Sequence, residues 1–468
     1  MATVHQFVTP HGKEITTYNP ATDEALHTYT KHTTLEAQQV IDQAHEAFKS
    51  WKDVSLEERA EILKTMGKLI TRDIDEIAEM MTKQMGKPIA QGKEEAKLCA
   101  KICEYEATEC VQYLQDETRE IQDGKTGIIT YQPIGVILAA QPWNFPLYQV
   151  IRYSSSVLLA GNTTVLMHAP INWAMAEKIR DLWLEAGVPE HAFEIVFVDT
   201  DTFDELIAYD KVRGVTMTGS AEGGKAVAQQ AGKYLKKSVL ELGGSDPYLI
   251  LEDADLDSMM ECLVEGRVNN AGQTCIAAKR FIVVDAIYDT FRDKFVEAME
   301  QVSYGDPMKE DTQMGPMARK DLRDKLQDQV DRAKKAGAEV LCGGEIPDGK
   351  GCFYPATVLD NVEPGNPAFD EELFGPVASL IRAKDEEDAI RLANHHSYGL
   401  GGGVFSADKE RAIKIARERI DTGMVNVNGY AIAQPNMPFG GVKESGWGRE
   451  HGGFGVREFV NIKSVFVS

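Results

Sequence analysis

A single cysteine lies in a short window of small and polar residues. Residues 269–281 read NNAGQTCIAAKRF, in which Cys275 is followed by the cations Lys279 and Arg280. Free cysteines are most often buried as small apolar side chains. A cysteine thiolate can also attack a carbonyl carbon. The window alone therefore leaves two interpretations of Cys275 open, a core residue or a nucleophile.

Two other side chains follow apolar runs and match further parts of such a reaction. Asn144 lies in the turn PWNFP, where its amide either donates to an oxyanion or only shapes the turn. Glu241, in LELGGSDP, ends a predicted strand. An apolar setting raises the pKa of a carboxyl group, which suits a general base near neutral pH. The alternative is a solvated loop glutamate.

Two loops could contact a nucleotide. The turn that contains Gly219 and Ser220 joins a predicted strand to a predicted helix, and a helix N-terminus binds phosphate through its free N–H groups. An ordinary strand-to-helix turn is the alternative. Glu372, in DEELFGPV, could bind ribose hydroxyls, or it could belong to a solvated acidic loop with Asp370 and Glu371.

These residues require elements that position them. Strand-like and helix-like segments alternate from GVILAA (135–140) to residue 241, which predicts a parallel, doubly wound sheet that binds ligands at the carboxyl ends of its strands. A second alternating unit runs from about residue 237 to 425, with Cys275 near its start.

Helices are expected before the first sheet, and a hairpin interrupts them. TTLE (33–36) and SLEE (55–58) are capping-box patterns, and apolar residues from Ile62 to Ile74 recur at helical spacing toward a stop at Gly86. Asp123-Gly124 indicates a hairpin. The tail at 456–468 alternates like a strand, which would pair with this hairpin in the same chain or in a neighbour.

Composition narrows the class of protein. The chain has 468 residues and a formal net charge of -23, which allows two or three domains and argues against nucleic acid or anionic membrane as a partner. Seven scattered cysteines do not form a disulfide framework. Cys99 and Cys103 lie one helical turn apart with no nearby histidine, so we expect a buried helix face and no metal. The absence of a signal-peptide pattern in residues 1–15 favours the cytoplasm.

Six motifs in order resemble one family over essentially the whole chain. They are PWNFP, MTGS, LELGGSDP, GQTCIAAKRF, EELFGPV and PFGGVKESGWGRE. Together they resemble the NAD(P)-dependent aldehyde dehydrogenase superfamily. The cysteine window, with Ala271 as an inserted residue, is most similar to the succinate-semialdehyde dehydrogenase-like branch.

The resemblance implies an α/β fold with three parts. A Rossmann-type cofactor-binding domain would cover residues 1–115 and 135–241, and a second α/β domain, the catalytic one, would cover 242–443. A hairpin at 116–134 and a C-terminal strand at 455–468 would form a small β element for oligomerisation, in a homodimer or a homotetramer.

The resemblance also implies a mechanism. Cys275 would attack an aldehyde to give a thiohemiacetal, whose oxyanion would be held by the Asn144 amide and the Cys275 backbone N–H. Hydride transfer to NAD or NADP would leave a thioester. Glu241 would then activate the water that hydrolyses it.

Cofactor contacts carry over in the same way. Gly219 and Ser220 match the turn at the pyrophosphate, and Trp143 lies against the cofactor. Glu372 matches the carboxylate on the nicotinamide ribose, with Phe374 beside the nicotinamide.

The chain departs from the family at TTVLMHAP. Met167 stands where the family usually has a lysine that contacts the adenosine ribose, and His168 is a candidate substitute or a structural residue. Pro170 stands where NAD-preferring relatives often carry a glutamate. The lost glutamate leaves room for NADP and the lost lysine removes a partner for it, so the cofactor stays NAD or NADP.

Two arginines are candidates for substrate recognition. Arg152 lies eight residues after Asn144, where relatives that oxidise succinate semialdehyde use an arginine for the distal carboxylate. Arg267 is the second candidate, and a solvated or surface-paired arginine is the alternative for both. The expected substrate is thus a small aldehyde, with succinate semialdehyde first and another short aliphatic or hydroxy-aldehyde second. A non-catalytic binding relative and a thioesterase-like hydrolase stay open as alternatives.

Overall fold

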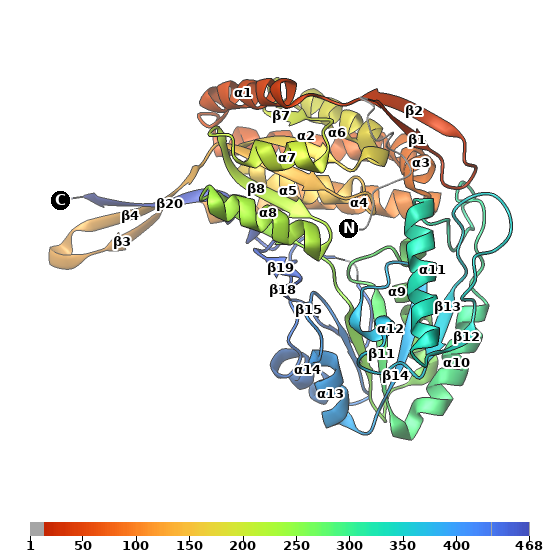
Figure 1. Cartoon of the computed structure of the whole chain (residues 1–468). Helices are drawn as coiled ribbons and strands as arrows, with labels where there is room; N and C mark the ends of the chain where they lie inside the picture. Colours follow the sequence, from red (N-terminus) through yellow and green to blue (C-terminus); the bar gives the residue numbers. More distant parts are fainter. Residues whose placement is uncertain (1–13, 432, 468) are drawn as a thin grey trace.

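The computed structural model describes residues 14–431 and 433–467 (Figure 1). Residues 1–13 of the first expected domain, with most of the segment considered for a signal peptide, lie outside the described residues, and so does residue 468 of the expected C-terminal strand. No helix in the described ranges is long and apolar enough to cross a bilayer.

The first sheet is doubly wound, as predicted. Its strands lie in the order β19 (Gly446–Trp447), β9 (Lys237–Glu241), β8 (Val212–Thr218), β5 (Val136–Gln141), β6 (Thr163–His168) and β7 (Phe193–Ile195). All neighbours are parallel except β19, which runs antiparallel to β9. The chain winds from β5 out to β7 and then returns across β5 to β8, so the strand order switches direction between β5 and β8. Ligands bind outside the carboxyl ends of strands at such a switch point.

Helices cover both faces of this sheet (Figure 1). Along β5, Val136, Leu138 and Ala140 pack against one helical layer, and Ile137 and Ala139 pack against the other. This alternation follows from the two-residue period of a strand. The first layer consists of α1 (Thr34–Trp51), α7 (Thr200–Ile207) and α8 (Ala221–Lys233). The second consists of α5 (Tyr148–Leu159) and α6 (Trp173–Ala186), with α2 (Leu56–Arg72), α3 (Ile74–Met85) and α4 (Ile89–Tyr105) outside them.

The N-terminal helices begin where the sequence predicts but are broken once more than expected. Both capping boxes form, at Thr33 and at Ser55, and the third helix ends at Gly86 in the left-handed region. The predicted continuous helix through Ile74 is wrong, because Asp73 leaves helical geometry and separates α2 from α3. The Asp73 carboxylate pairs with Arg72 and, at 2.8 Å, with Lys178 of α6.

The second sheet is the second α/β unit that the sequence predicts. Its order is β12 (Glu339–Cys342), β13 (Thr357–Asp360), β14 (Val377–Ala383), β11 (Ala278–Val284), β10 (Asp246–Ile250), β16 (Gly403–Phe405) and β17 (Asn426–Val427), parallel except for β12. The helices α9 (Leu256–Val268), α10 (Tyr288–Glu300), α11 (Lys320–Lys335), α13 (Glu386–Asn394) and α14 (Lys409–Glu418) pack on it (Figure 1). Cys275 lies in the loop between α9 and β11.

A three-stranded antiparallel arm projects from the body, toward the left of Figure 1. It contains β3 (Glu117–Glu120), β4 (Thr126–Pro133) and β20 (Val460–Val467). Asp123 (φ 63°) and Gly124 (φ 70°) form the predicted turn. The tail strand β20 pairs with β4 of the same chain along its whole length, which settles where its partner lies.

The remaining elements are short. They are the pair β1 (Glu14–Tyr18) and β2 (Ala25–Thr30), the pair β15 (Tyr398–Gly399) and β18 (Val442–Lys443), and the helix α12 (Pro367–Asp370).

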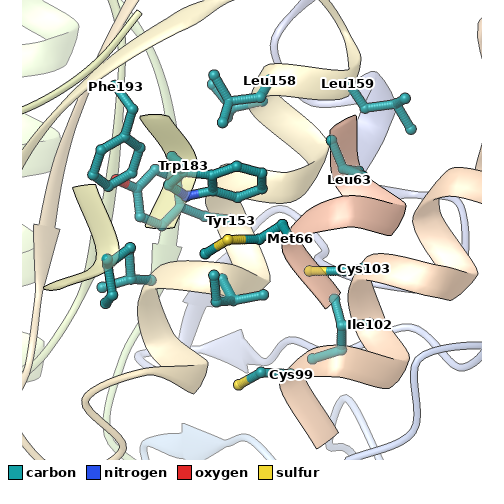
Figure 2. Packing of buried hydrophobic residues seen from close by; sticks show 14 of the residues in the cluster. Leu63, Met66, Cys99, Ile102, Cys103, Tyr153, Leu158, Leu159, Trp183 and Phe193 are labelled. Carbon is teal, nitrogen blue, oxygen red and sulfur yellow. The ribbon is translucent and has the colours of Figure 1, made fainter. Parts of the chain in front are cut away.

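Cys99 and Cys103 belong to the core, as expected. Both belong to the cluster between α2, α4 and α5, where Figure 2 shows Cys103 near Met66 and Cys99 near Ile102. Both are free and fully buried. Within the described ranges, no group of three or more potential ligand side chains could hold a metal ion.

Candidate active site

A cavity of about 500 Å³ opens at the switch point of the first sheet and reaches into the second unit. Its wall includes the loops after β5, β8 and β9, the Cys275 loop and the segment after α12. Seven of the predicted site residues line it: Trp143, Asn144, Gly219, Ser220, Cys275, Glu372 and Phe374. The topology thus brings together residues that lie more than two hundred positions apart.

The Cys275 loop has an unusual backbone. Asn270 (φ 55°) and Ala271 (φ 52°) are consecutive left-handed residues, and Gly272 (φ 71°) follows them. The half-buried Cys275 residue lines the cavity. Burial of the thiol raises its pKa to about 11. The cations Lys279 and Arg152 oppose that shift. Across the described residues, the Cys275 backbone N–H donates to no other protein group, so it is free to bind an oxyanion.

Asn144 is connected directly to this loop. Its side-chain amide donates to the Gln273 backbone carbonyl at 3.0 Å, and the Asn144 backbone carbonyl accepts from Asn270 Nδ2 at 2.7 Å. Gln149 Nε2 donates to Asn144 Oδ1 at 3.4 Å. Because a backbone carbonyl only accepts, the bond to Gln273 shows which end of the Asn144 amide carries the N–H groups. An amide nitrogen has two N–H donors. One therefore holds the loop, and the other can donate into the cavity.

Buried contacts with Glu95 and Lys87 hold the turn that follows Asn144. Glu95 Oε1 accepts from the N–H groups of Leu147 and Tyr148, both at 2.9 Å, where α5 begins without a cap of its own. Lys87 pairs with Glu95 and lies 3.6 Å from the centre of the Phe145 ring. These buried contacts fix the turn before any ligand arrives.

Glu241 lies beside the cavity rather than in its wall. It is the last residue of β9, its side chain is 2% exposed, and neither carboxylate oxygen has a hydrogen-bond partner among the described residues. Burial raises its pKa well above the ordinary value, and the guanidinium of Arg152 opposes the shift. Gly440 packs on it so closely that a Cβ there would lie 2.7 Å from Glu241 Oε1. Its neighbours Leu242 and Gly243 do line the cavity.

Most of the candidate cofactor residues also line this cavity. Ser220 caps α8 by accepting from the Gly223 N–H, and the Gly219 N–H donates to the Glu241 carbonyl at 3.0 Å. The rings of Trp143 and Phe374 meet edge to face, 5.7 Å between centres. Glu372 Oε1 accepts from the Gly244 N–H at 3.2 Å.

The end of β6 is arranged differently. The neutral His168 ring donates from Nε2 to the Pro146 carbonyl (2.9 Å) and accepts at Nδ1 from the Ala169 N–H (3.0 Å). Burial lowers its pKa to about 4, in keeping with that neutral form. Met167 packs against the apolar face of the sheet, and Pro170 begins a short 3-10 helix. His168 therefore has no ring nitrogen free for a cofactor.

Neither arginine lines the cavity. Arg152 is buried, pairs with Glu450 and donates to Thr218 Oγ1 at 3.0 Å. Its Nη1 has no acceptor among the described residues. Arg267 is also buried and donates to the Gly272 carbonyl at 2.8 Å. The expected alternative of a solvated or surface-paired arginine does not apply to either residue.

Several residues of this arrangement escaped the sequence analysis. Asn270, Gln273 and Glu450 act through contacts between segments distant in sequence, so no local spacing marks them. Gln149 lies one helical turn beyond the Asn144 turn, which is a usable but weak signal. Lys279 lies four residues after Cys275, in the motif window that the sequence already marks as a candidate site.

Comparisons with known proteins agree with this geometry. A model described as "Aldehyde dehydrogenase family" matches residues 7–465. The succinate semialdehyde dehydrogenase [NAD(P)+] Sad of Escherichia coli (strain K12) is 42% identical over 96% of this chain and 96% of its own length. The succinate-semialdehyde dehydrogenase [NADP(+)] of Deinococcus radiodurans is 40% identical over 96% of this chain and 94% of its own.

A solved structure gives the same result. Succinic semialdehyde dehydrogenase from Streptococcus pyogenes, crystallised with NADP+ as the cofactor, is similar with a TM-score of 0.94 and 39% identity. The match covers 97% of this chain and 99% of that one.

Proposed function

The chain belongs to the aldehyde dehydrogenase family, and we propose that it oxidises succinate semialdehyde to succinate with NAD or NADP. One observation carries the proposal. A single cavity at the switch point joins the Cys275 thiol, the Asn144 amide, the turn after β8 and the Glu372 carboxylate, with Glu241 buried beside it.

The cavity residues fit a nicotinamide dinucleotide. The free N–H groups at the start of α8 suit a pyrophosphate, and Glu372 suits ribose hydroxyls. Gly243 keeps the floor open, since a Cβ there would lie 2.4 Å from Glu372 Oε2. Trp143 and Phe374 provide aromatic walls. When bound, this cofactor supplies the acceptor for the hydride.

The first step is attack by the Cys275 thiolate on the aldehyde carbon. The new oxyanion accepts from the Cys275 N–H and the free N–H of Asn144, both of which are in place before the substrate binds. Removing one such donor typically costs about 10²–10³ in rate. A preorganised pair therefore lowers the barrier without rearrangement of the loop.

Release of the product requires a base. After the hydride leaves, the acyl group is a thioester on Cys275, and water must attack it. Glu241 is proposed to take the proton from that water. Its buried, unpartnered carboxylate and raised pKa make it a stronger base than a solvated glutamate. The proton then sits on a carboxyl group whose neutral form the surroundings favour.

The distal carboxylate of the substrate is proposed to pair with Arg152. The Arg152 Nη1 has no protein acceptor, and the guanidinium lies over the Phe439 ring, which packs beside Cys275. Arg267, whose Nε and Nη1 also lack acceptors within the described residues, is the second proposed partner. An anionic group between Cys275 and these cations would select a semialdehyde over an uncharged aldehyde.

The assembly is part of the proposal. The cofactor-binding domain is placed at 1–115 and 135–241, the catalytic domain at 242–443, and the arm at 116–134 and 455–468. Ile462 and Phe466 on the arm are 61% and 75% exposed, which supports burial against other copies in a homodimer or homotetramer. Free cysteines throughout the described residues support a reducing cytoplasm.

The test is steady-state formation of reduced cofactor from NAD and NADP, across succinate semialdehyde and uncharged aldehydes of equal length. We expect the highest kcat/KM with succinate semialdehyde. Arg152→Gln should lower kcat/KM for the acidic aldehyde at least about tenfold more than for the uncharged one, because an ion-paired hydrogen bond is lost only there. Equal losses on both would reject the carboxylate contact. A preference for an uncharged or hydroxylated aldehyde would reject the substrate.

A further inference from the structure

One buried cation in the site has no part in the steps above. Lys279 is the residue that follows Ala278 at the start of β11, and its side chain is 2% exposed. Burial of an ammonium is costly unless every donor is satisfied. Its surroundings therefore indicate what the protein uses it for.

The Lys279 ammonium has three acceptors, one for each of its N–H donors. They are the Cys275 carbonyl (2.5 Å), the Gly244 carbonyl (2.6 Å) and Glu372 Oε1 (2.9 Å). These acceptors belong to three separate segments of the cavity: the nucleophile loop, the loop after the Glu241 strand, and the segment with the candidate ribose carboxylate. The ammonium is the point at which all three meet.

The backbone is built to aim this side chain. In the ladder between β10 and β11, Ala278 pairs with Asp246 and Arg280 pairs with Pro247, so Lys279 is the extra residue of a β-bulge. A bulge re-aims a side chain that regular alternation would send elsewhere. Without the bulge, Lys279 and Arg280 could not both keep their present directions. Arg280 instead donates to the carbonyls of Ser245, Leu392 and Ala393.

We propose that Lys279 is a positioning residue for the reaction: its ammonium ties the Cys275 loop, the loop after the Glu241 strand and Glu372 into one unit, and its charge favours the thiolate of Cys275. The proposal rests on Cys275 being the nucleophile of the proposed function.

The charges around the thiol support an electrostatic role. Of the groups that lower the pKa of Cys275, Lys279 is the largest and Arg152 is next, whereas Glu372 and Asp246 raise it. Tyr148 of α5 and Tyr430 after β17 also face the thiol. Burial raises the pKa of Asp246 to about 7, so it is only partly charged near neutral pH. Lys279 and Glu372 therefore act on the thiolate in opposite directions while they hold each other in place.

This opposition gives a test that a purely structural lysine would not pass. The rate of Cys275 alkylation by iodoacetamide is measured against pH in the full-length protein without aldehyde or nicotinamide, by mass spectrometry of the Cys275 peptide. Alkylation follows the thiolate fraction. Lys279→Met should slow it about tenfold at pH 8, which corresponds to an upward pKa shift of about one unit. Glu372→Gln should speed it, by about three- to tenfold.

The matched control is Arg332→Met. Arg332 pairs with Glu371, which is next to Glu372 in the chain, and Arg332 itself does not line the cavity. Its alkylation profile should stay within about twofold of the wild type, because a solvent-screened pair contributes little. In steady-state turnover, Lys279→Met should lower kcat by a larger factor than it changes the KM for the aldehyde or for the cofactor.

The proposal is overturned if Lys279→Met and Glu372→Gln change alkylation in the same direction, as loosening of the loop would do, or if Lys279→Met leaves it unchanged. Should Lys279→Met not fold, Lys279→Gln replaces it: slower alkylation in Lys279→Gln with faster alkylation in Glu372→Gln supports the proposal, and changes in the same direction overturn it. Because no cofactor or aldehyde is present, this result is separate from the dehydrogenase assignment. If wild-type Cys275 reacts no faster than the half-buried Cys262, the nucleophile assignment fails instead.

Discussion

The Cys275 end of the cavity and the end of β6 differ in whether their buried polar groups are hydrogen-bonded. At Cys275, a backbone N–H and both oxygens of Glu241 have no protein partner in the described part of the chain. At the end of β6, both ring nitrogens of His168 are bonded to backbone, and Met167 packs into the apolar layer. Glu241 and His168 each end a strand of the first sheet, and Cys275 precedes β11 of the second sheet.

The difference separates groups held for a reaction from groups held for the fold. Most buried polar groups in native proteins are paired, so an unpaired one needs an explanation. Glu241 and the Cys275 N–H are left unpaired where an incoming carbonyl and water would use them. His168 is paired because it joins β6 to the Asn144 turn through Pro146. Buried polar groups thus carry different roles according to whether the fold leaves them without a partner.

The largest expected effect is at the nucleophile. Cys275→Ala should lower kcat by at least about 10³, because no covalent step is left and single members of a catalytic unit cost this much or more. Steady-state formation of reduced cofactor measures it. Cys262→Ala, at a half-buried cysteine of α9 outside the cavity, is the control and should keep nearly full activity. Turnover that persists in Cys275→Ala rejects the nucleophile.

The base gives the next effect. Glu241→Gln should lower kcat by about 10²–10⁴, the usual contribution of a general base. The wild-type pH profile tests the same residue. Because burial raises the pKa of Glu241, the base is protonated over a wider pH range, so kcat should fall as pH falls through that raised pKa. The variant should lack this acid limb. An unchanged limb would mean that another group titrates.

His168 should behave as a structural residue. His168→Leu leaves the buried Pro146 carbonyl without its ring donor, while the Ala169 N–H keeps its bond to the Gln141 carbonyl, so the free energy of unfolding should fall by about 1–3 kcal/mol. Denaturant unfolding measures this change. The KM for NAD and for NADP should stay within about twofold. A large rise in KM with unchanged stability would move His168 to the cofactor site and remove the contrast between the two regions.

The smallest effect is at the family departure. Met167→Lys adds a cation to a half-buried position at the end of β6, where the proposed function places the adenosine side of the cofactor. A partly screened charge pair is worth up to about 1 kcal/mol, or about fivefold in affinity. The KM for NADP should fall by that amount and the KM for NAD by less. No change in either would place the adenosine ribose elsewhere.

The sequence predicts most of the frame for physical reasons that are local. Capping boxes at Thr33 and Ser55, the left-handed turn at Asp123-Gly124 and strand-helix alternation each depend on neighbours in the chain. The break at Asp73 could not be predicted, because Lys178, one of its ion-pair partners, lies 105 residues away.

The candidate site divides in the same way. Cys275, Asn144 and Glu241 stand in motifs, and the fold places the first two in one cavity with the third beside it. Whether a group there is free or bonded depends on tertiary contacts. The Arg152–Glu450 pair and the backbone bonds of His168 join positions that no spacing connects. The roles of Arg152 and Arg267 toward a substrate therefore stay predictions.

The most direct test of the account is to trap the covalent intermediate. Glu241→Gln is mixed with succinate semialdehyde and the cofactor, quenched in acid, and analysed by peptide mass spectrometry. We expect one succinyl group on Cys275, with about one equivalent of reduced cofactor formed in a burst, because the thioester forms but its hydrolysis lacks a base. Formation of reduced cofactor with no acyl group on Cys275, or with the acyl group on another residue, would contradict it.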